Sequence, residues 1–378
     1  MSQVDIRWTS AKLGDICAFK YGKALPAYAR NGGAVAVYGS NGVVGWHDQS
    51  LSNGPTIIVG RKGSYGEINY SNGPCWPIDT AYYIDQLATD QDIRWLSYRL
   101  AALGLNAMNK SAAVPGLNRE DAYRLELMLP PLPEQRRIAT ILDQADALRA
   151  KRREALAQLD SLTQSIFIEM FGDPGSNPKA WPELQLGELI LGAPNNGIFK
   201  KNDEYGTGTP VVWVEELFKG DEIDCSNSRA LPASPRDKAR YGLRNGDLLF
   251  CRSSLKLAGI GYNNVYLGED GKALFECHVI RVSPDKDRVE PRFLNFALRV
   301  PSQRQKLFRF AKTVTMTTID QEGLLKISVP VPPVELQRRF SAHLTAVDLV
   351  RRRQTATLKE LDALFASLQH RAFAGQLS

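Results

Sequence analysis

An internal repeat constrains this chain of 378 residues more than any other feature. The segment Pro130–Ile138 (PPLPEQRRI) is matched about 200 residues later by Pro332–Phe340 (PPVELQRRF). Beyond both segments one fixed offset holds for about 35 residues, and the matched residues include Leu142 with Leu344, Asp146 with Asp348, Arg149 with Arg351, Asp160 with Asp362 and Phe171 with Phe373. Repetition at a constant offset indicates a duplicated structural unit. Each copy is a globular segment followed by a segment with helical periodicity.

The two segments after the Pro-Pro pairs are predicted to be long helices. Apolar residues recur there at spacings of three and four, which is typical of an amphipathic helix with one apolar face. We expect the first helix to stop at Asp173–Gly175 and the second at Gly375. At 1.5 Å per residue, each would be roughly 50 Å long.

Such a helix is not stable alone in water, so each must pack on something. One possibility is that each helix packs on its own globular segment. The near-identical apolar faces favour the other possibility, an antiparallel coiled coil of the two helices related by a pseudo-two-fold axis.

The globular segments are predicted to be rich in β-structure with some helix, so the fold class is α+β. Short apolar runs alternate with turn signals such as Ser40-Asn41-Gly42, in which Asn and Gly tolerate positive φ. Strands are expected at Ala34–Tyr38, Thr56–Val59, Val211–Val214 and Asp247–Phe250, and helices at Arg94–Leu105 and Pro291–Phe310.

Composition narrows the class of protein. The hydrophobic content of 43% supports two or three packed domains. The first residues lack the apolar run of a signal peptide, and no stretch of apolar residues is long enough for a membrane span. Five cysteines without CxxC spacing predict reduced thiols in the cytoplasm, and four scattered histidines predict no metal site. A net charge of +6 is compatible with binding phosphates but does not establish it.

Signatures of catalysis are absent from the sequence. It contains neither a GxxxxGK[ST] loop nor a GxGxxG turn after a strand. The Asn/Asp-Pro-Pro-Tyr/Phe motif of amino-methyltransferases is missing, and Pro284-Asp285 has no Glu-x-Lys at a useful distance for a nuclease core. The sequence therefore favours a binding protein over an enzyme.

One set of candidate binding residues lies just before the Pro-Pro pairs. The polar stretches Lys110–Leu117 and Lys312–Ile319 have similar flanks and different centres, and their lysines coincide at the offset of the repeat. In a recognition loop, lysines contact phosphate and short hydroxyl side chains contact base edges, which selects Lys110, Ser111, Lys312, Thr315 and Thr317. A solvent-exposed loop before a strand explains the same pattern and remains open.

A second set follows a buried strand in each copy. Arg61 comes after one such run and Arg252 after the other. An arginine can bond the O6 and N7 atoms of guanine in parallel or clamp a phosphate, whereas a structural salt bridge is the alternative. The polar neighbours Lys62, Ser64, Ser253 and Lys256 join this set. Tyr38, Asn41, Lys200 and Lys201 are further candidates that an ordinary turn or solvated lysine pair would also explain.

The repeated segments and the final Ala372–Leu377 resemble the specificity subunit of Type I restriction-modification systems. Tyr38–Gly42, Gly60–Ser64 and Pro77–Ala81 are similar to one variety of that family's target-recognition domains. The resemblance covers essentially the whole chain. It departs at Val334-Glu335-Leu336, where the first copy has Leu132-Pro133-Glu134, and we expect only a local change at the start of the second helix.

The resemblance implies a DNA-binding role. It predicts two mixed α/β target-recognition domains at residues 1–130 and 174–330, separated by spacer helices at 131–173 and 331–378. Each domain would bind one half of a bipartite site in double-stranded DNA. Two modification subunits, which carry S-adenosylmethionine and methylate adenine N6, and motor-nuclease subunits would be the partners. This chain would hold no cofactor and catalyse nothing.

Two other classes of protein stay open on the sequence. A protein-interaction scaffold could use the paired helices without binding DNA. A self-contained nuclease or methyltransferase would need a metal or cofactor motif, and none is found in the sequence.

Overall fold

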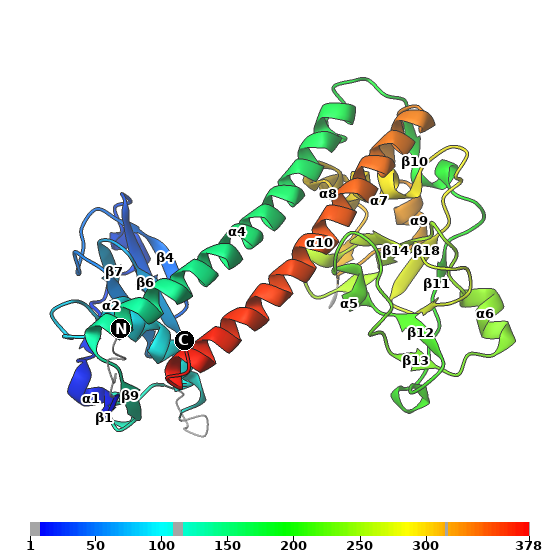
Figure 1. Cartoon of the computed structure of the whole chain (residues 1–378). Coiled ribbons are helices and arrows are strands. Elements are labelled where there is room, and N and C mark those ends of the chain that lie inside the picture. The colour runs from blue at the N-terminus through cyan, green and yellow to red at the C-terminus, as the bar shows by residue number, and fades with distance from the viewer. Residues whose placement is uncertain (1–7, 109–115, 314–316, 378) are drawn as a thin grey trace. The chain divides into compact units, whose positions relative to one another are not determined.

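The computed structural model describes residues 8–108, 116–313 and 317–377 of the chain (Figure 1). It divides into two compact units. Unit 1 comprises Met1–Ala155 with Gln354–Ser378, and unit 2 comprises Leu156–Arg353. Both units combine small β-sheets with helices, so the chain is of mixed α/β class. Each unit contains one globular segment together with a part of each long helix.

Unit 1 places its functional candidates around a four-stranded sheet. The order of this sheet is β2-β8-β5-β6, and a three-stranded sheet has the order β4-β3-β7. The elements of the globular part are β1 (Thr9–Lys12), α1 (Leu13–Ile16), β2 (Lys20–Tyr21), η1 (Ala27–Ala29), β3 (Val35–Gly39), β4 (Gly42–His47), β5 (Thr56–Gly60), β6 (Ile68–Ser71), β7 (Cys75–Pro77), β8 (Ala81–Ile84), α2 (Ile93–Ala102), η2 (Leu105–Ala107), α3 (Arg119–Tyr123) and β9 (Glu126–Leu129).

Strand β5 is the centre of unit 1, since all five of its residues are buried between β6 and β8. Its apolar residues suit this position because a strand covered on both faces reads as a continuous apolar run. Helix α2 covers the sheet and contributes Trp95, which is fully buried. The core also includes Leu13, Phe19, Ile57, Val59, Ile84, Leu96, Leu100, Ile138 and Leu142.

Unit 2 repeats this plan with a different set of elements. Its largest sheet has the order β11-β18-β14-β16, and β14 is again fully buried. The elements are β10 (Glu183–Gln185), η3 (Leu186–Leu189), β11 (Asn195–Asn196), η4 (Asn202–Glu204), β12 (Thr209–Val212), α5 (Val214–Leu217), β13 (Ala230–Leu231), α6 (Pro235–Tyr241), β14 (Leu248–Cys251), β15 (Ser253–Ser254), η5 (Leu257–Gly259), β16 (Asn263–Val265), β17 (Leu274–Phe275), β18 (Val279–Val282), α7 (Pro291–Arg299), α8 (Pro301–Phe308), β19 (Lys312–Thr313), β20 (Thr317–Thr318), α9 (Gln321–Leu325) and β21 (Ser328–Pro330).

The two long helices predicted from periodicity are confirmed. Helix α4 spans Leu132–Phe171 and α10 spans Val334–Phe373, each of 40 residues. Gly375 lies just beyond α10 with φ 69°, as expected, whereas α4 is followed by Gly172 with φ 77°, one residue before the expected stop at Asp173–Gly175.

Both long helices are fixed at their starts by a buried glutamine. The Gln135 side chain accepts a hydrogen bond from the Asp92 N–H (2.9 Å) and donates one to the Pro130 carbonyl (2.8 Å). In unit 2 the side chain of Gln337 accepts from the Glu290 N–H (2.8 Å) and donates to the Pro332 carbonyl (2.7 Å). The repeated Gln of the sequence is thus an internal brace in each copy.

Within each unit the parts of α4 and α10 are joined by the same type of ion pair. In unit 1, Arg149 of α4 pairs with Asp362 of α10 at 2.6 Å. In unit 2, Arg351 of α10 pairs with Asp160 of α4 at 2.9 Å. These four residues are related by the offset of the repeat, so each copy supplies the arginine once and the aspartate once.

Two predicted elements differ from the structure. The helix expected over Pro291–Phe310 is divided into α7 and α8, because Pro301 cannot donate its backbone hydrogen bond and Val300 is extended, with ψ 136°. The strand expected over Val211–Val214 ends at Val212, and Val214 instead begins α5. In the described parts of the chain, no helix is both long and apolar enough to cross a bilayer.

Candidate nucleic-acid interface

In unit 1, Arg61 lies directly after the buried strand β5, and its backbone is fixed on both sides. The Arg61 N–H donates to the Thr80 carbonyl (2.9 Å), while the Arg61 carbonyl accepts from the Leu117 N–H (3.0 Å). The Arg61 side chain donates through Nη1 to the Asp79 carbonyl (3.0 Å). Residues from two distant parts of the sequence, Asp79-Thr80 and Leu117, therefore fix the direction of one arginine.

The guanidinium of Arg61 belongs to a cationic and aromatic surface. It lies 5.1 Å from the ring centroid of Tyr21 and 5.8 Å from that of Tyr82. Arg119 approaches the same Tyr21 ring to 5.5 Å. Tyr21 is 54% exposed, whereas Tyr82 is buried, and burial raises the pKa of Tyr82 to about 12. The surface thus presents two cations flanking an accessible ring, a combination that suits phosphates and bases.

The other predicted residues of unit 1 lie around the same loop. The Thr80 carbonyl accepts from the Lys62 N–H (3.1 Å) and the Ser40 hydroxyl (2.5 Å) as well as from Arg61, which draws the β3–β4 turn towards the loop. Asn41 is exposed at this turn and Tyr38 is partly exposed in β3. Lys62 is exposed and Ser64 partly exposed in the loop itself. The structure thus brings these candidates together, with Ser40 and Thr80 as the link.

Arg252 in unit 2 is held in a matching frame after β14. Its N–H donates to the His278 carbonyl (2.8 Å), its Nη1 donates to the Cys277 carbonyl (3.4 Å), and its own carbonyl accepts from the Ile319 N–H (3.0 Å). Each of these bonds has a counterpart at Arg61. Leu117 and Ile319, which donate to the two arginine carbonyls, are also related by the offset of the repeat.

The loops that begin with these arginines also close in the same way. The Gly66 N–H donates to the Gly60 carbonyl (2.8 Å), and the Gly261 N–H donates to the Cys251 carbonyl (2.8 Å). We call the segments between these anchors loop 1 (Arg61–Tyr65) and loop 2 (Arg252–Ile260).

A cleft of about 420 Å³ borders loop 2. Its wall includes Trp213 and Arg229, whose guanidinium lies 4.8 Å from a Trp213 ring centroid. Ser253 also lines it, with its hydroxyl 3.3 Å from Nδ1 of His278. Loop 2 therefore has an arginine and an aromatic ring beside it, as loop 1 does, but the acidic side chains of Glu215 and Glu276 line the same cleft.

Glu276, Cys277 and His278 form a cluster with potential metal-ligand atoms within 4.8 Å of one another. Burial raises the pKa of both the Glu276 carboxyl and the Cys277 thiol. Glu276 accepts the His278 N–H at 2.8 Å, and the carbonyls of Cys277 and His278 accept from Arg252. We therefore assign these residues to the frame of loop 2.

The remaining predicted residues of unit 2 are distributed differently. Lys256 is exposed in loop 2, and Thr317 is buried in β20, which pairs with β15 beside Arg252. Lys312 forms an exposed ion pair with Asp320 (2.7 Å), and Lys200 pairs with Glu204 (3.3 Å).

Lys201 is exposed next to Lys200 and directly precedes the short helix η4. Lys110, Ser111 and Thr315 lie outside the described residues. All of these assignments to DNA contact stay predictions.

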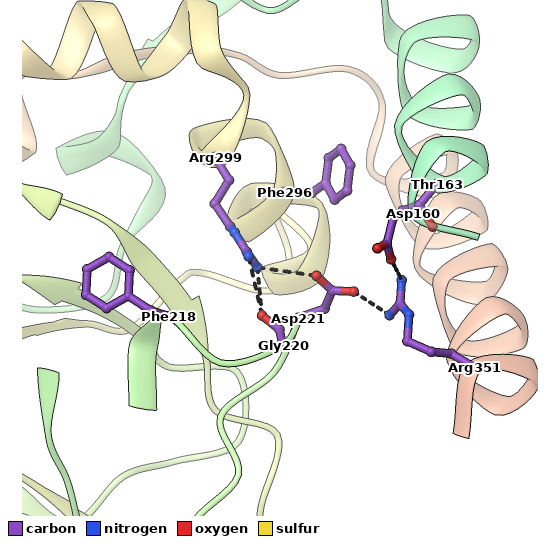
Figure 2. Close-up of a pocket in the computed structure, with 8 residues that line it drawn as sticks. All are labelled: Asp160, Thr163, Phe218, Gly220, Asp221, Phe296, Arg299 and Arg351. Atoms are coloured by element: carbon purple, nitrogen blue, oxygen red, sulfur yellow. Dashed lines mark hydrogen bonds and ion pairs between the residues drawn. The ribbon is translucent and has the colours of Figure 1, made fainter. Parts of the chain in front are cut away.

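A second cavity of unit 2, of about 450 Å³, serves a different purpose. Figure 2 shows Asp221 between Arg299 and Arg351. The Asp221 carboxylate lies 2.5 Å from Arg351 and 3.5 Å from Arg299, and Arg351 also reaches Asp160. Because these charges neutralise one another, the network fastens the segment that follows α5 to the long helices, and it has no excess charge for an ionic ligand.

Four residues of these surfaces were not predicted from the sequence. Tyr21 and Arg119 lie beside Arg61, and Trp213 and Arg229 line the cleft at loop 2. The basic and aromatic run Lys20–Lys23 was a usable signal for Tyr21. Arg119 and Arg229 had none, because their positions depend on which strands become neighbours.

Comparisons with known proteins agree with the resemblance drawn from the sequence. Residues 6–158 match the family described as Type I restriction modification DNA specificity domain. The Type I restriction enzyme EcoKI specificity subunit of Escherichia coli (strain K12) is 24% identical over 292 residues, which cover 72% of this chain and 62% of that relative. The EcoBI specificity subunit of Escherichia coli is 23% identical over 358 residues, covering 85% of this chain and 73% of the relative.

Solved structures show a related fold. The crystal structure of the Type-I restriction-modification system S subunit from M. genitalium superimposes with a TM-score of 0.61 at 17% identity, covering 99% of this chain and 98% of that one. A chain from work on complex assembly and conformational transition of the type I R-M system gives a TM-score of 0.54 at 19% identity, with coverage of 99% and 100%. The resemblance to specificity subunits is confirmed, although this chain spans only 62% of the length of the EcoKI relative.

Proposed function

We propose that this chain is the sequence-specificity subunit of a Type I restriction-modification complex. It binds a bipartite site in double-stranded DNA, one half-site to each globular segment. The recognition domains are residues 1–130 and 174–330, and the spacer helices are within 131–173 and 331–378. The matching specificity-domain family and the named relatives support this proposal.

The observation that carries the proposal is the matched frame of loops 1 and 2. In both, a buried strand delivers an arginine whose N–H, side chain and carbonyl make equivalent backbone hydrogen bonds. Each arginine is held at its backbone and through Nη1 of its guanidinium, which gives its remaining N–H groups a fixed direction for contact with a guanine edge or a phosphate. The residues inside the loops differ, as expected of two domains that recognise different bases.

The spacer is a pseudo-two-fold antiparallel coiled coil of α4 and α10 in this proposal. The exchange of partners between Arg149–Asp362 and Arg351–Asp160 supports it, because a two-fold relation makes each contact occur twice with the roles reversed. A rigid spacer fixes the distance between the recognition domains, and half-sites about one helical turn apart face the same side of B-DNA.

Catalysis belongs to the partners. Two modification subunits would bind S-adenosylmethionine and methylate adenine N6, and motor-nuclease subunits would cut unmodified DNA. The target adenine must leave the duplex to react, so it would enter the pocket of a modification subunit. This chain would work in the cytoplasm without a cofactor of its own, through residues such as Arg61 and Arg252.

A protein-interaction scaffold is the alternative function. The exposed apolar residues of the long helices, such as Leu148, Leu162 and Leu349, would be its binding surface. Salt-independent behaviour on mixed DNA would favour this alternative. A self-contained nuclease or methyltransferase is less favoured, and tight binding of S-adenosylmethionine by the isolated chain would support it.

Mapping of methylated adenine tests the proposal. The chain is expressed with its neighbouring modification subunit in a host that lacks both, and the DNA is sequenced by a long-read method that detects the methyl group. A split motif with a fixed gap is expected. Absence of new methylation, with the partner shown to be folded and active, would favour the scaffold instead.

A further inference from the structure

Loop 2 is longer than loop 1 although their anchors match. Five residues separate Gly60 from Gly66, and nine separate Cys251 from Gly261. The additional length carries Leu255, which is 87% exposed, and the exposed residues that follow it. A longer loop loses more conformational freedom when it is ordered, so loop 2 needs supports that loop 1 does not.

Arg304 of helix α8 supplies such a support through a hydrogen bond to the backbone of loop 2. Its Nη2 donates a hydrogen bond of 2.6 Å to the carbonyl of Ala258, within loop 2. The guanidinium carbon lies 5.0 Å from the ring centroid of Phe308 and 5.5 Å from that of Tyr262. Arg304 is only 7% exposed, so this side chain cannot itself reach DNA.

The charge of Arg304 is not explained by the stability of the fold. Among the described residues, Nη1 of Arg304 is buried without a hydrogen-bond partner. The guanidinium contacts the rings of Tyr262 and Phe308 and the carbonyl of Ala258. Burial lowers the pKa of Arg304 to about 10, which reflects the cost of desolvating it. An unbranched apolar side chain would fill the same space without that cost.

Residues 255–258 are exposed, but the chain after them is packed closely at Gly259 and at the anchor Gly261, so a support at Ala258 acts on a constrained part of the loop. A Cβ on Gly259 would lie 2.4 Å from the hydroxyl of Ser254. Gly261 has φ +58°, and a Cβ there would meet Leu307 of α8 at 2.5 Å. The Lys256 N–H donates to the Ser254 hydroxyl (3.1 Å). A shift at Ala258 would therefore move Lys256 and the residues that precede it.

We propose that Arg304 is a positioning residue for DNA recognition, which holds loop 2 so that Arg252 and Lys256 meet one half-site in a fixed geometry. This inference rests on the proposed function. It assigns to a buried residue a role in specificity without contact with DNA.

The test compares Arg304→Met with wild type in the complex with the modification subunit. Binding is measured on a library of split sites in which each half-site is varied in turn, and thermal unfolding is measured on the same samples. Arg304→Met is expected to keep or raise the melting temperature. It should reduce base discrimination about tenfold in one half-site only, the effect of losing one well-placed arginine contact. Arg304→Lys should restore part of the discrimination.

Two further variants separate position from charge. Arg309→Met removes the same charge from the exposed end of α8 and should leave discrimination in both half-sites unchanged. Gly259→Ala places a Cβ against Ser254 within loop 2, so it should displace the loop without touching Arg304 and relax the same base positions as Arg304→Met.

The outcomes distinguish the proposed function from the role of Arg304. If the wild-type complex shows no preference for a split site, the proposed function itself is overturned. A wild type that binds a split site, with unchanged discrimination in Arg304→Met, would overturn only the positioning role. Unfolding of Arg304→Met would also overturn it, because the buried charge would then be needed for the fold.

Discussion

Replacing Gln135 with Leu should lower the free energy of unfolding of unit 1, although the two side chains are similar in size. The side chain is 1% exposed and fills the corner between the start of α4 and the start of α2. Leucine would leave the Asp92 N–H and the Pro130 carbonyl without the partners they have now. A buried polar group left unpaired costs about 1–3 kcal/mol, so two of them cost about 2–6 kcal/mol, less about 1 kcal/mol recovered by burying apolar surface.

Gln144→Leu is a matched control, because Gln144 lies in the same helix and is exposed. Its expected effect is within about 0.5 kcal/mol. Urea denaturation of both variants gives the free energies of unfolding. Hydrogen exchange of the peptide around Trp95 gives the local effect, since Asp92 caps the helix that contains it. Equal losses of unfolding free energy in the two variants, or unchanged hydrogen exchange around Trp95, would refute the bracing role of Gln135.

Three other predictions concern specificity, pH and spacing. Arg61→Ala should relax one half-site by about tenfold in the split-site binding assay, and an equal loss in both halves would contradict its assignment to one domain. Burial raises the pKa of the Glu290 carboxyl above its usual 4.5, so the folded chain holds this proton more tightly than the unfolded chain does. The free energy of unfolding therefore falls as the pH rises from 4.5 through the raised pKa. Glu290→Gln should lack this part of the decline in urea denaturation between pH 4.5 and 8, and parallel curves would argue against it. Inserting four residues, about one turn, into α4 should change the gap of the methylated motif or prevent assembly, and an unchanged gap with normal assembly would exclude a rigid spacer.

The long helices were predictable because their signals are local. Periodicity along the chain indicated their extent, and Gly375 marked the end of the second, while Gly172 at the end of the first was not selected. The break at Pro301 was equally visible in the sequence, but the apolar pattern over Pro291–Phe310 favoured one helix. Periodicity could not show which helix packs on which, because an apolar face does not determine the surface that it packs against.

The recognition surfaces were predictable only in part. Arg61 and Arg252 stood out because each follows a buried strand, and strand ends present side chains to solvent. Tyr21 lies beside Arg61 because β2 and β5 both flank β8, an order that local patterns do not determine. Arg304 gave no signal, because nothing in the sequence distinguishes a buried arginine from the exposed ones around it.

The matched frame and the unmatched loops have different physical requirements. Apart from the Nη1 bonds of the arginines themselves, the bonds around Arg61 and Arg252 join backbone groups, so the neighbouring side chains can change while the frame persists. The loop between the anchors is free to vary in length, but each added residue must be held by something outside the frame. In unit 2 that support includes Arg304, a charge buried at a cost to stability. On the proposed function, a new specificity would therefore require changes in two places, the loop proposed to contact DNA and the helix that supports it.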